Sequence, residues 1–220
     1  RLEYLPQEPA FHGDATVLEQ VFLGLSPEAR QLAEYEAKTI LTKLGVPQFD
    51  KPVSQLSGGQ RKRGAMASAL VHPCDVLMMD ASSSASAILR YLKRFKGLTL
   101  ITNSAITIGG LQDINAQVFV TGGYMPKNSQ GFVGPYAENM VRNFNADLFF
   151  FSCAGLSMDG CVTDISSDEN SIRKVMFQQA RRRILLCDSS KFGKSLCFNT
   201  CSLDQVDALI SDQPFTGKGA

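Results

Sequence analysis

The sequence predicts an α/β fold: a mostly parallel sheet with helices on both faces, preceded by a mainly helical N-terminal segment. From Asp75 onward, short apolar runs alternate with helical patterns, and two of these runs end in aspartate, at Asp80 and Asp188. Such alternation is typical of a parallel sheet that is covered on both faces. The chain has 220 residues, of which 44% are hydrophobic and 20% charged, so it suits one large domain or one and a half.

Three helices are expected in the N-terminal segment. The first, TVLEQVFLGL (residues 16–25), begins at a threonine cap, Thr16. The second covers residues 26–46, with Ser26 as its N-cap, Pro27 as its first residue and Gly45 as its stop. The third follows a double glycine and covers residues 60–71.

Six strands and five helices are expected after residue 75. The strands are residues 76–80, 98–103, 116–123, 146–155, 183–190 and 208–212. The helices are residues 84–95, 105–114, 135–144, 166–182 and 202–206. In such sheets a ligand binds outside the carboxyl ends of the strands, so functional residues are expected there.

Charge and cysteine usage restrict the function classes. A net charge of +1 argues against a dedicated nucleic-acid surface, although two basic clusters are present, RKR at 61–63 and RRR at 181–183. We expect the second cluster to end a helix and complement its dipole. The six cysteines form no CxxC pair and only two histidines are present, so no zinc site is indicated. Buried thiols and the lack of a signal peptide or membrane span favour a cytoplasmic protein.

The motif LSGGQRKR (residues 56–63) resembles the signature motif of ABC ATPases. With YLPQEP (residues 4–9) and TVLEQVF (residues 16–22), it makes about residues 1–80 similar to the ABC-F subfamily of soluble ABC proteins. The resemblance implies that Gln7 is the Q-loop glutamine. It also implies that residues of the signature contact the nucleotide of a facing subunit: Ser57, Gly58, Gly59 and Gln60. Backbone N–H groups at a helix start suit this role.

The same segment departs from the ATPase pattern. The sequence contains no GxxxxGK[ST] loop, Ala81 stands where the catalytic glutamate is expected, and Asn103 stands where the switch histidine is expected. The β-phosphate then has no cradle and the attacking water has no base. We therefore expect the N-terminal segment to have a packing role only, rather than to hydrolyse ATP. We expect no catalytic residue, no cofactor and no metal.

From about Asp75 to Asp212 the chain resembles the effector-binding domain of DeoR-family repressors of sugar metabolism. Seven segments carry the resemblance in order: MDASSSA, LTLITNS, VFVTGG, GFVGP, ADLFFFSCAGLSMDGCVTD, SIRKVMFQQARR and LLCDSSKFGK. The resemblance implies the Rossmann-like α/β fold of ribose-phosphate isomerases and CoA transferases, and a phosphorylated sugar or sugar derivative as effector. We accordingly divide the chain into an ABC-F-like segment (1–74), a sugar-phosphate-binding domain (75–215) and a tail (216–220).

The candidate ligand residues follow from these segments. The serines after Asp80 supply hydroxyl groups where a strand leads into a helix, which suits a phosphate, and Lys191 supplies a positive charge. The family has glycine where Ser82 stands. The full candidate set is Asp80, Ser82, Ser83, Ser84, Thr102, Asn103, Gly122, Gly123, Gly155, Asp159, Asp164 and Lys191. Each of these polar residues also has an ordinary structural reading, as a cap, turn former or surface charge.

Three functions remain open at this point. The favoured one is a non-catalytic sensor of a sugar phosphate; the alternatives are an incomplete ATP-binding module and a phosphosugar isomerase that uses Asp159, Asp164 and Lys191. No helix-turn-helix is recognisable before residue 75, so specific DNA binding is not expected, and an assembly of identical chains is left open. The two resemblances meet at a strand that both families possess, which indicates a chimera with its seam near Ala81.

Overall fold

The computed structural model describes residues 3–5, 15–22, 27–57, 60, 64, 67, 75–92, 97–110 and 114–219. The chain divides into two compact units, which are described separately. The larger unit contains Cys74–Leu209, together with short terminal pieces, and the smaller unit contains Tyr4–Pro73 and Ile210–Pro214. A three-residue strand, β1 (Glu3–Leu5), lies near the start of the chain.

The larger unit is built on a mostly parallel sheet, as the sequence predicted. Six of its strands follow the order β10-β8-β5-β2-β3-β4. They are β2 (Val76–Met79), β3 (Leu98–Thr102), β4 (Ala116–Val120), β5 (Ala146–Ser152), β8 (Ala180–Leu186) and β10 (Ala208–Ile210). The pairs β2–β3, β2–β5, β3–β4 and β5–β8 are parallel. The apolar side chains of β2 and β5 are almost entirely buried, as strands covered on both faces require.

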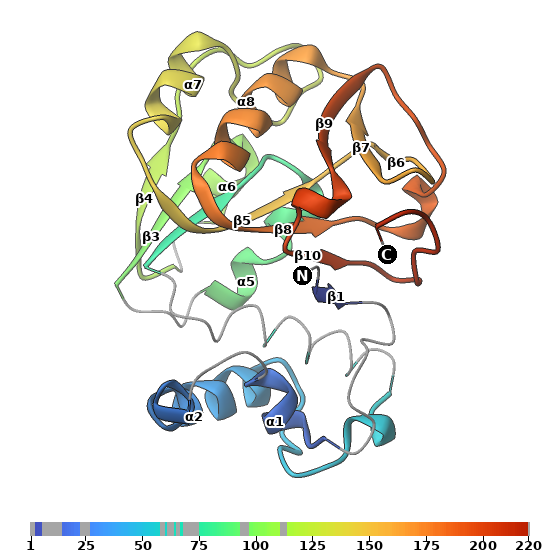
Figure 1. The fold of residues 1–220 in the computed structure, drawn as a ribbon. Helices are drawn as coiled ribbons and strands as arrows, with labels where there is room; N and C mark the ends of the chain where they lie inside the picture. The colour runs from blue at the N-terminus through green and yellow to red at the C-terminus, as the bar shows by residue number, and fades with distance from the viewer. Residues whose placement is uncertain are drawn as a thin grey trace. The chain divides into compact units, whose positions relative to one another are not determined.

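Short helices connect the strands. They are α4 (Ser83–Ser86), α5 (Leu89–Leu92), α6 (Ala105–Gly109), α7 (Pro135–Val141) and the longest, α8 (Ser167–Gln178). Figure 1 shows α7 and α8 side by side on one face of the sheet and α5 on the other. In the described part of the helix expected over residues 84–95, which ends at residue 92, there are two short helices with a turn between them. The stacked rings of Phe149 and Phe151, whose centroids lie 5.1 Å apart, are fully buried in the core.

A second, antiparallel sheet was missed by the sequence reasoning. It has the order β6-β7-β9 and contains β6 (Gly155–Leu156), β7 (Cys161–Asp164) and β9 (Phe198–Ser202). Two short 3-10 helices, η3 (Ser189–Lys191) and η4 (Leu203–Gln205), flank β9 in the chain. These strands are too short and too polar to show a clear alternation in the sequence. Their consequence for the site is that β7 ends in Asp164.

The prediction for the basic cluster at residues 181–183 was wrong. These arginines do not end α8, because the helix stops at Gln178 and β8 begins at Ala180. Arg183 folds back so that its Nε donates a hydrogen bond of 2.9 Å to the Phe177 carbonyl. Its guanidinium lies 4.6 Å from the centre of the Phe177 ring. The apolar stems of the arginines allow them to occupy a strand, which the charge pattern concealed.

The smaller unit is helical in the part that the structure describes. It contains α1 (Val17–Val21), α2 (Pro27–Lys43) and the 3-10 helix η1 (Val53–Gln55). Thr16 caps α1 in a reciprocal capping box with Glu19, as its position predicted. Gly45, the expected stop of the second helix, has a φ of 74°. Of the third expected helix, Gln60, Gly64 and Ala67 are described and are helical. No helix in the described ranges is long and apolar enough to span a membrane.

Candidate functional site

A cavity of about 300 Å³ lies in the larger unit, where β2, β3, β5 and β7 end. It is lined at that edge by polar ends of strands, and on another side by the buried face of α8 and by the loop before α7. Its lining residues are Asp80, Ala81, Ser82, Ser83, Asn103, Asn128, Ser129, Gln130, Ser152, Cys153, Ala154, Asp164, Ile165, Glu169, Ile172, Arg173, Met176 and Lys191. This is the place at which an open α/β sheet holds a ligand.

Arg173, on the buried face of α8, joins two carboxylates of the cavity. Its Nε lies 3.1 Å from an oxygen of Asp80, and its Nη1 donates to Asp164. All three side chains are buried, with relative exposures of 8% or less. Burial opposes the charge of Arg173, but the attraction of Asp80 and Asp164 outweighs it and holds the pKa of the guanidinium above its usual value. The arginine is therefore a permanent buried cation.

The two carboxylates are held from other directions as well. Asp80 accepts hydrogen bonds from the Ser152 backbone N–H at 3.0 Å and from the Ser82 hydroxyl at 2.5 Å. Asp164 accepts the backbone N–H of Ile165 at 2.7 Å. These bonds tie the ends of β2, β5 and β7 to α8 through one arginine. In the described part of the chain, no group of three or more histidine, cysteine, aspartate or glutamate side chains is placed to hold a metal ion.

Asn103 lines the cavity and carries a buried side-chain oxygen that the described part of the chain leaves unpaired. Its side chain is 3% exposed, and its Nδ2 donates a 3.0 Å hydrogen bond to the Phe132 carbonyl. Its Oδ1 has no hydrogen-bond partner among the described residues. A side chain at Gly131 would bring Cβ within 2.9 Å of Asn103 Nδ2 and 2.6 Å of Ala81 Cβ, so glycine is needed there. The amide is thus fixed in place, and its bare carbonyl oxygen suits a hydroxyl donor from a ligand.

Lys191 supplies the second cation of the cavity. Its Nζ donates to the Ser152 hydroxyl at 3.1 Å and lies 3.3 Å from a carboxylate oxygen of Asp188. Ser152 in turn donates its hydroxyl to the Leu186 carbonyl at 2.6 Å. The hydroxyl of Ser190 lowers the pKa of Asp188; partial burial opposes the shift and Lys191 adds to it. Two of the three N–H groups of Lys191 are engaged by Ser152 and Asp188, and the third is available to an anion in the cavity that Lys191 lines.

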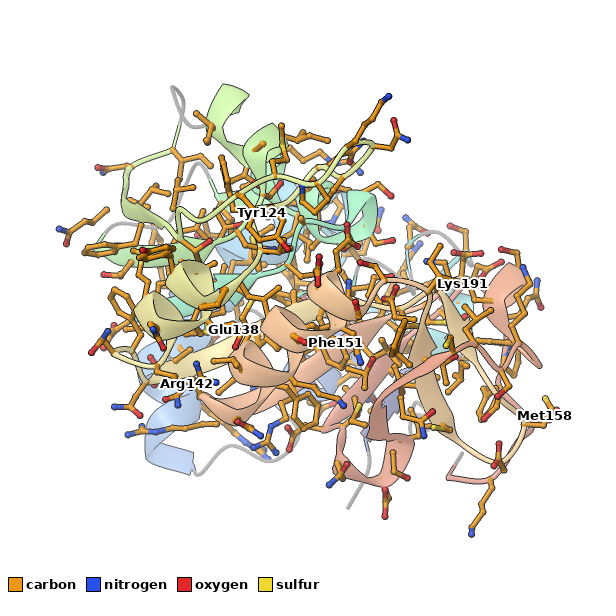
Figure 2. All side chains as sticks on the ribbon, turned by 90° about the horizontal axis from the view of Figure 1, so that it is seen from above. Tyr124, Glu138, Arg142, Phe151, Met158 and Lys191 are labelled. Carbon is orange, nitrogen blue, oxygen red and sulfur yellow. The ribbon has the colours of Figure 1, made fainter. Side chains whose placement is uncertain are left out.

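The loop before α7 is tied to the first turn of α8. The Tyr124 hydroxyl donates to Asp168 at 2.8 Å, and the Ser129 hydroxyl donates to Glu169 at 2.6 Å. Figure 2 shows Tyr124 and Lys191 from above, as labelled side chains on different parts of the larger unit. The hydrogen bond to Asp168 raises the pKa of Tyr124, so this hydroxyl stays protonated and remains a donor. The loop thereby holds Ser129 at the cavity wall.

The structure brings half of the predicted ligand residues together. Six of the twelve line the cavity: Asp80, Ser82, Ser83, Asn103, Asp164 and Lys191. Their roles differ, since Asp80 and Asp164 are engaged by Arg173 and the Ser82 hydroxyl both donates to Asp80 and caps α4. Asn103 and Lys191 line the cavity and keep hydrogen-bonding capacity, at the Oδ1 of Asn103 and at the ammonium group of Lys191.

The other six predicted residues do not line this cavity: Ser84, Thr102, Gly122, Gly123, Gly155 and Asp159. Thr102 is fully buried and accepts the Ser104 N–H at 3.1 Å. Gly123, with a φ of 104°, passes so close to the Val133 carbonyl that a Cβ would lie 2.4 Å from it. Gly155 similarly approaches the Lys194 carbonyl. Asp159 accepts the Ser157 hydroxyl, which lowers its pKa, in the turn between β6 and β7.

The sequence reasoning missed most of the cavity wall. Arg173 is the most important omission, because it lies inside an amphipathic helix and resembles any solvated charge there. A charged residue in register with Ile172 and Met176 is the signal that could have found it. Ser152 was missed because it is part of an apolar strand, and Ser129 because it lies in a polar loop without a motif.

The predicted nucleotide-contacting residues are described only in part. Gln7, Gly58 and Gly59 lie outside the described residues. Ser57 and Gln60 bond each other reciprocally: the Ser57 N–H donates to Gln60 Oε1 at 3.0 Å, and the Gln60 N–H donates to Ser57 Oγ at 3.3 Å. This is the arrangement of a capping box, which accounts for both side chains without a ligand.

Comparison with known proteins gives two family matches. Residues 59–213 match the DeoR C terminal sensor domain, and residues 1–84 match the ABC transporter family. The chain is 31% identical over 147 residues to the HTH-type transcriptional regulator GolR of Listeria innocua, which is 66% of this chain and 58% of that protein. It is 30% identical over 145 residues to the L-fucose operon activator of Haemophilus influenzae, again 66% and 58%.

A third relative extends over more of the chain. The HTH-type transcriptional regulator IolR of Bacillus subtilis is 25% identical over 181 residues, which is 82% of this chain and 72% of that protein. The chain spans 58% of the length of the first two relatives. The sheet order, the cavity at the strand ends and the match over residues 59–213 agree, and this chain belongs to the DeoR family through its C-terminal sensor domain.

Proposed function

We propose that the larger unit is a sensor that binds a phosphorylated sugar in the cavity between the strand ends and α8. The observation that carries the proposal is that two residues with unused hydrogen-bonding capacity line one cavity: Asn103, whose Oδ1 has no partner among the described residues, and Lys191 with its ammonium group. A sugar hydroxyl can donate a hydrogen bond to the unpaired Oδ1 of Asn103, and a phosphate is an anion that can pair with the ammonium group of Lys191. A cavity of about 300 Å³ lies at the small end of ligand sites, which suits a monosaccharide derivative.

The relatives support the same class of ligand. One of them is named for an operon of L-fucose, a sugar, and the others are named as transcriptional regulators. We propose accordingly that the unit serves transcription regulation by reporting the level of a sugar phosphate. Ser82 and Ser83 stand beside the cavity as further hydroxyl groups for the effector.

We propose that the unit catalyses no reaction on the sugar. The isomerase alternative needs Asp159, Asp164 and Lys191 to face one substrate. Asp159 is outside the cavity lining, and Asp164 is bonded to a buried arginine. The Asp164 oxygen that accepts from Arg173 is therefore already occupied and is not free for a substrate.

We also propose that the N-terminal segment is an ABC-type sequence that is joined to the sensor domain and has only a structural role. The two family matches overlap at residues 59–84, which include β2. After that strand, Asp80 is followed by Ala81 where an ABC ATPase has its catalytic glutamate, and Ala81 and Ser82 belong to the cavity wall. On this proposal the N-terminal segment binds ATP weakly or not at all.

A thermal-shift panel tests the proposed function. Ribose 5-phosphate, fructose 6-phosphate and glucosamine 6-phosphate are compared with ATP and with the unphosphorylated sugars. At least one sugar phosphate is expected to raise the melting temperature, in proportion to the logarithm of its concentration above the dissociation constant. A rise with ATP and none with any phosphosugar would contradict the proposal. Chromatography of the phosphosugars after incubation with the protein tests for catalysis. Conversion of any of them into another sugar phosphate would contradict the proposed absence of catalysis.

Replacing Asn103 with alanine is expected to weaken binding of the sugar phosphate by about tenfold, the value of one neutral hydrogen bond. Isothermal titration calorimetry measures the affinity. Asn139→Ala is the matched control, because Asn139 is exposed on α7 outside the cavity. Unchanged affinity in the folded Asn103→Ala protein would show that its carbonyl does not contact the effector.

A further inference from the structure

Two free cysteines lie in contact at the ends of neighbouring strands, beside the cavity. Cys153 follows β5 and Cys187 follows β8, and their sulfur atoms are 3.5 Å apart. Both side chains are buried, with exposures of 5% and 2%. Cys153 also lines the cavity.

The backbone at this place has the spacing that a disulfide requires. Ser152 and Leu186, the residues before the two cysteines, are Cα partners in the parallel pair β5–β8. Neighbouring strands lie about 4.8 Å apart, which falls inside the Cα–Cα range that disulfides adopt. The sulfur atoms need to approach by roughly 1.5 Å to reach bonding distance, a movement that side-chain rotation together with a small shift of the two strand ends supplies.

We propose that Cys153 and Cys187 form a reversible redox site whose disulfide weakens effector binding in the adjoining cavity. The effect on binding rests on the proposed sensor function, whereas formation of the disulfide does not. In a reducing cytoplasm such a bond forms only transiently, as in thiols that report oxidants. The sensor would then respond to a sugar phosphate and to oxidants through one cavity.

The oxidant is a small peroxide, and the chemistry balances. The Cys153 thiolate attacks one peroxide oxygen, so that a sulfur–oxygen bond forms, the oxygen–oxygen bond breaks and hydroxide leaves. The Cys187 sulfur then attacks the Cys153 sulfur, forming the disulfide, and the departing oxygen leaves as water with the Cys187 proton. The two thiols lose two electrons, and hydrogen peroxide is reduced to two water molecules once the hydroxide takes up the first thiol proton.

The surroundings favour Cys153 as the attacking thiol. The hydrogen bond that it shares with Cys187 lowers the pKa of Cys153; burial opposes this shift, and the charges of Lys191 and Arg173 reinforce it. The same hydrogen bond and burial raise the pKa of Cys187, so Cys187 keeps its proton. Cys153, which lines the cavity, is thus the nucleophile, and Cys187 is the resolving thiol.

The link to binding runs through Lys191. Each cysteine is the chain neighbour of a residue that holds the lysine: Cys153 follows Ser152, and Cys187 precedes Asp188. Drawing the sulfur atoms together displaces both neighbours, and with them the ammonium group. Losing one charge-assisted hydrogen bond to a phosphate corresponds to a roughly tenfold or greater rise in the dissociation constant.

Peptide mapping tests the first half of the proposal. The chain is treated with hydrogen peroxide, alkylated, digested and analysed by mass spectrometry. A peptide pair joined through Cys153 and Cys187 is expected, and dithiothreitol is expected to release it. In Cys187→Ala, the Cys153 sulfenic acid should persist and be trapped by dimedone. Cys197→Ser, a change at an exposed cysteine, should leave the crosslink intact. Peroxide treatment that links other cysteines, or that oxidises Cys153 only to the sulfinic acid, would overturn the redox site.

Calorimetric titration with the three sugar phosphates tests the second half. The reduced chain is expected to bind at least one of them, and the oxidised chain to bind it about tenfold more weakly, reversibly with dithiothreitol. Cys187→Ala and Cys187→Ser should bind like the reduced chain with or without peroxide. Equal or higher affinity in the oxidised chain, or a peroxide effect that survives both substitutions, would overturn the coupling. Absence of binding by the reduced chain would overturn the proposed function and the coupling, while the peptide map would still decide whether the disulfide forms.

Discussion

Replacing Arg173 with methionine is expected to lower the free energy of unfolding by about 3–5 kcal/mol, the usual cost of breaking a buried ion pair. The arginine is 7% exposed and is bonded to Asp80 and Asp164, both of which are buried. Methionine fills a similar volume but leaves two carboxylates without their counter-charge. Each must then be protonated or hydrated at a cost, because desolvation of an uncompensated charge is unfavourable.

Urea denaturation measures the change, and Lys174→Met is the matched control. Lys174 is the next residue on the same helix and carries the same charge, but it is exposed. The control variant should change the free energy of unfolding by no more than about 0.5 kcal/mol. A loss below about 1 kcal/mol in Arg173→Met would show that the ion pairs do not hold the strand ends to α8.

The fold of the larger unit was predictable because its strands are strongly apolar and separated by helical patterns. The runs that became β2, β3 and β5 are buried on both faces, so their hydrophobicity is continuous and easy to recognise. The small sheet β6-β7-β9 was not predictable for the opposite reason: its strands are short and partly exposed. The start of β8 was predicted wrongly, because the arginines at residues 181–183 resemble the end of a helix, whereas they lie in the strand.

The site was predictable only where motif and strand end coincide. Three of the lining residues directly follow strands that the sequence predicts: Asp80, Asn103 and Lys191. They could be predicted because a ligand binds outside the carboxyl ends of the strands in such a sheet. Arg173 was hidden because its partners, Asp80 and Asp164, lie 93 and 9 residues away in the chain and come from two different strands. Local sequence does not show that a helical arginine faces a carboxylate brought there by the sheet.

The two cations of the cavity, Arg173 and Lys191, therefore have different roles. Arg173 is buried and shared by two carboxylates, so its charge is already compensated and it holds the wall together. Lys191 is partly exposed, with a relative side-chain exposure of 24%, and its carboxylate partner, Asp188, is not among the lining residues of the cavity. An anionic effector can therefore form a favourable contact with Lys191 without disrupting a buried ion pair. For this reason Arg173→Met is expected to lower stability, whereas Lys191→Met is expected to weaken binding.

Replacing Lys191 with methionine is expected to weaken binding of the sugar phosphate by roughly 10- to 150-fold, the value of a charge-assisted hydrogen bond of about 1.5–3 kcal/mol. The free energy of unfolding should change by less than about 1 kcal/mol, because the pair with Asp188 is partly exposed. Lys191→Arg should retain part of the affinity, since it keeps the charge but not the geometry.

Calorimetric titration of the effector against each variant measures these losses, with Lys194→Met as the control. Lys194 is three residues further along the chain and is exposed outside the cavity lining, so its removal tests the loss of a positive charge from the same region. Binding of the unphosphorylated sugar should be equally weak in all variants, because the lysine acts on the phosphate. If Lys194→Met lost as much affinity as Lys191→Met, general electrostatic attraction would explain the binding. If Lys191→Met kept full affinity, the phosphate would have to be held elsewhere, and the serines after Asp80 would be the next residues to replace.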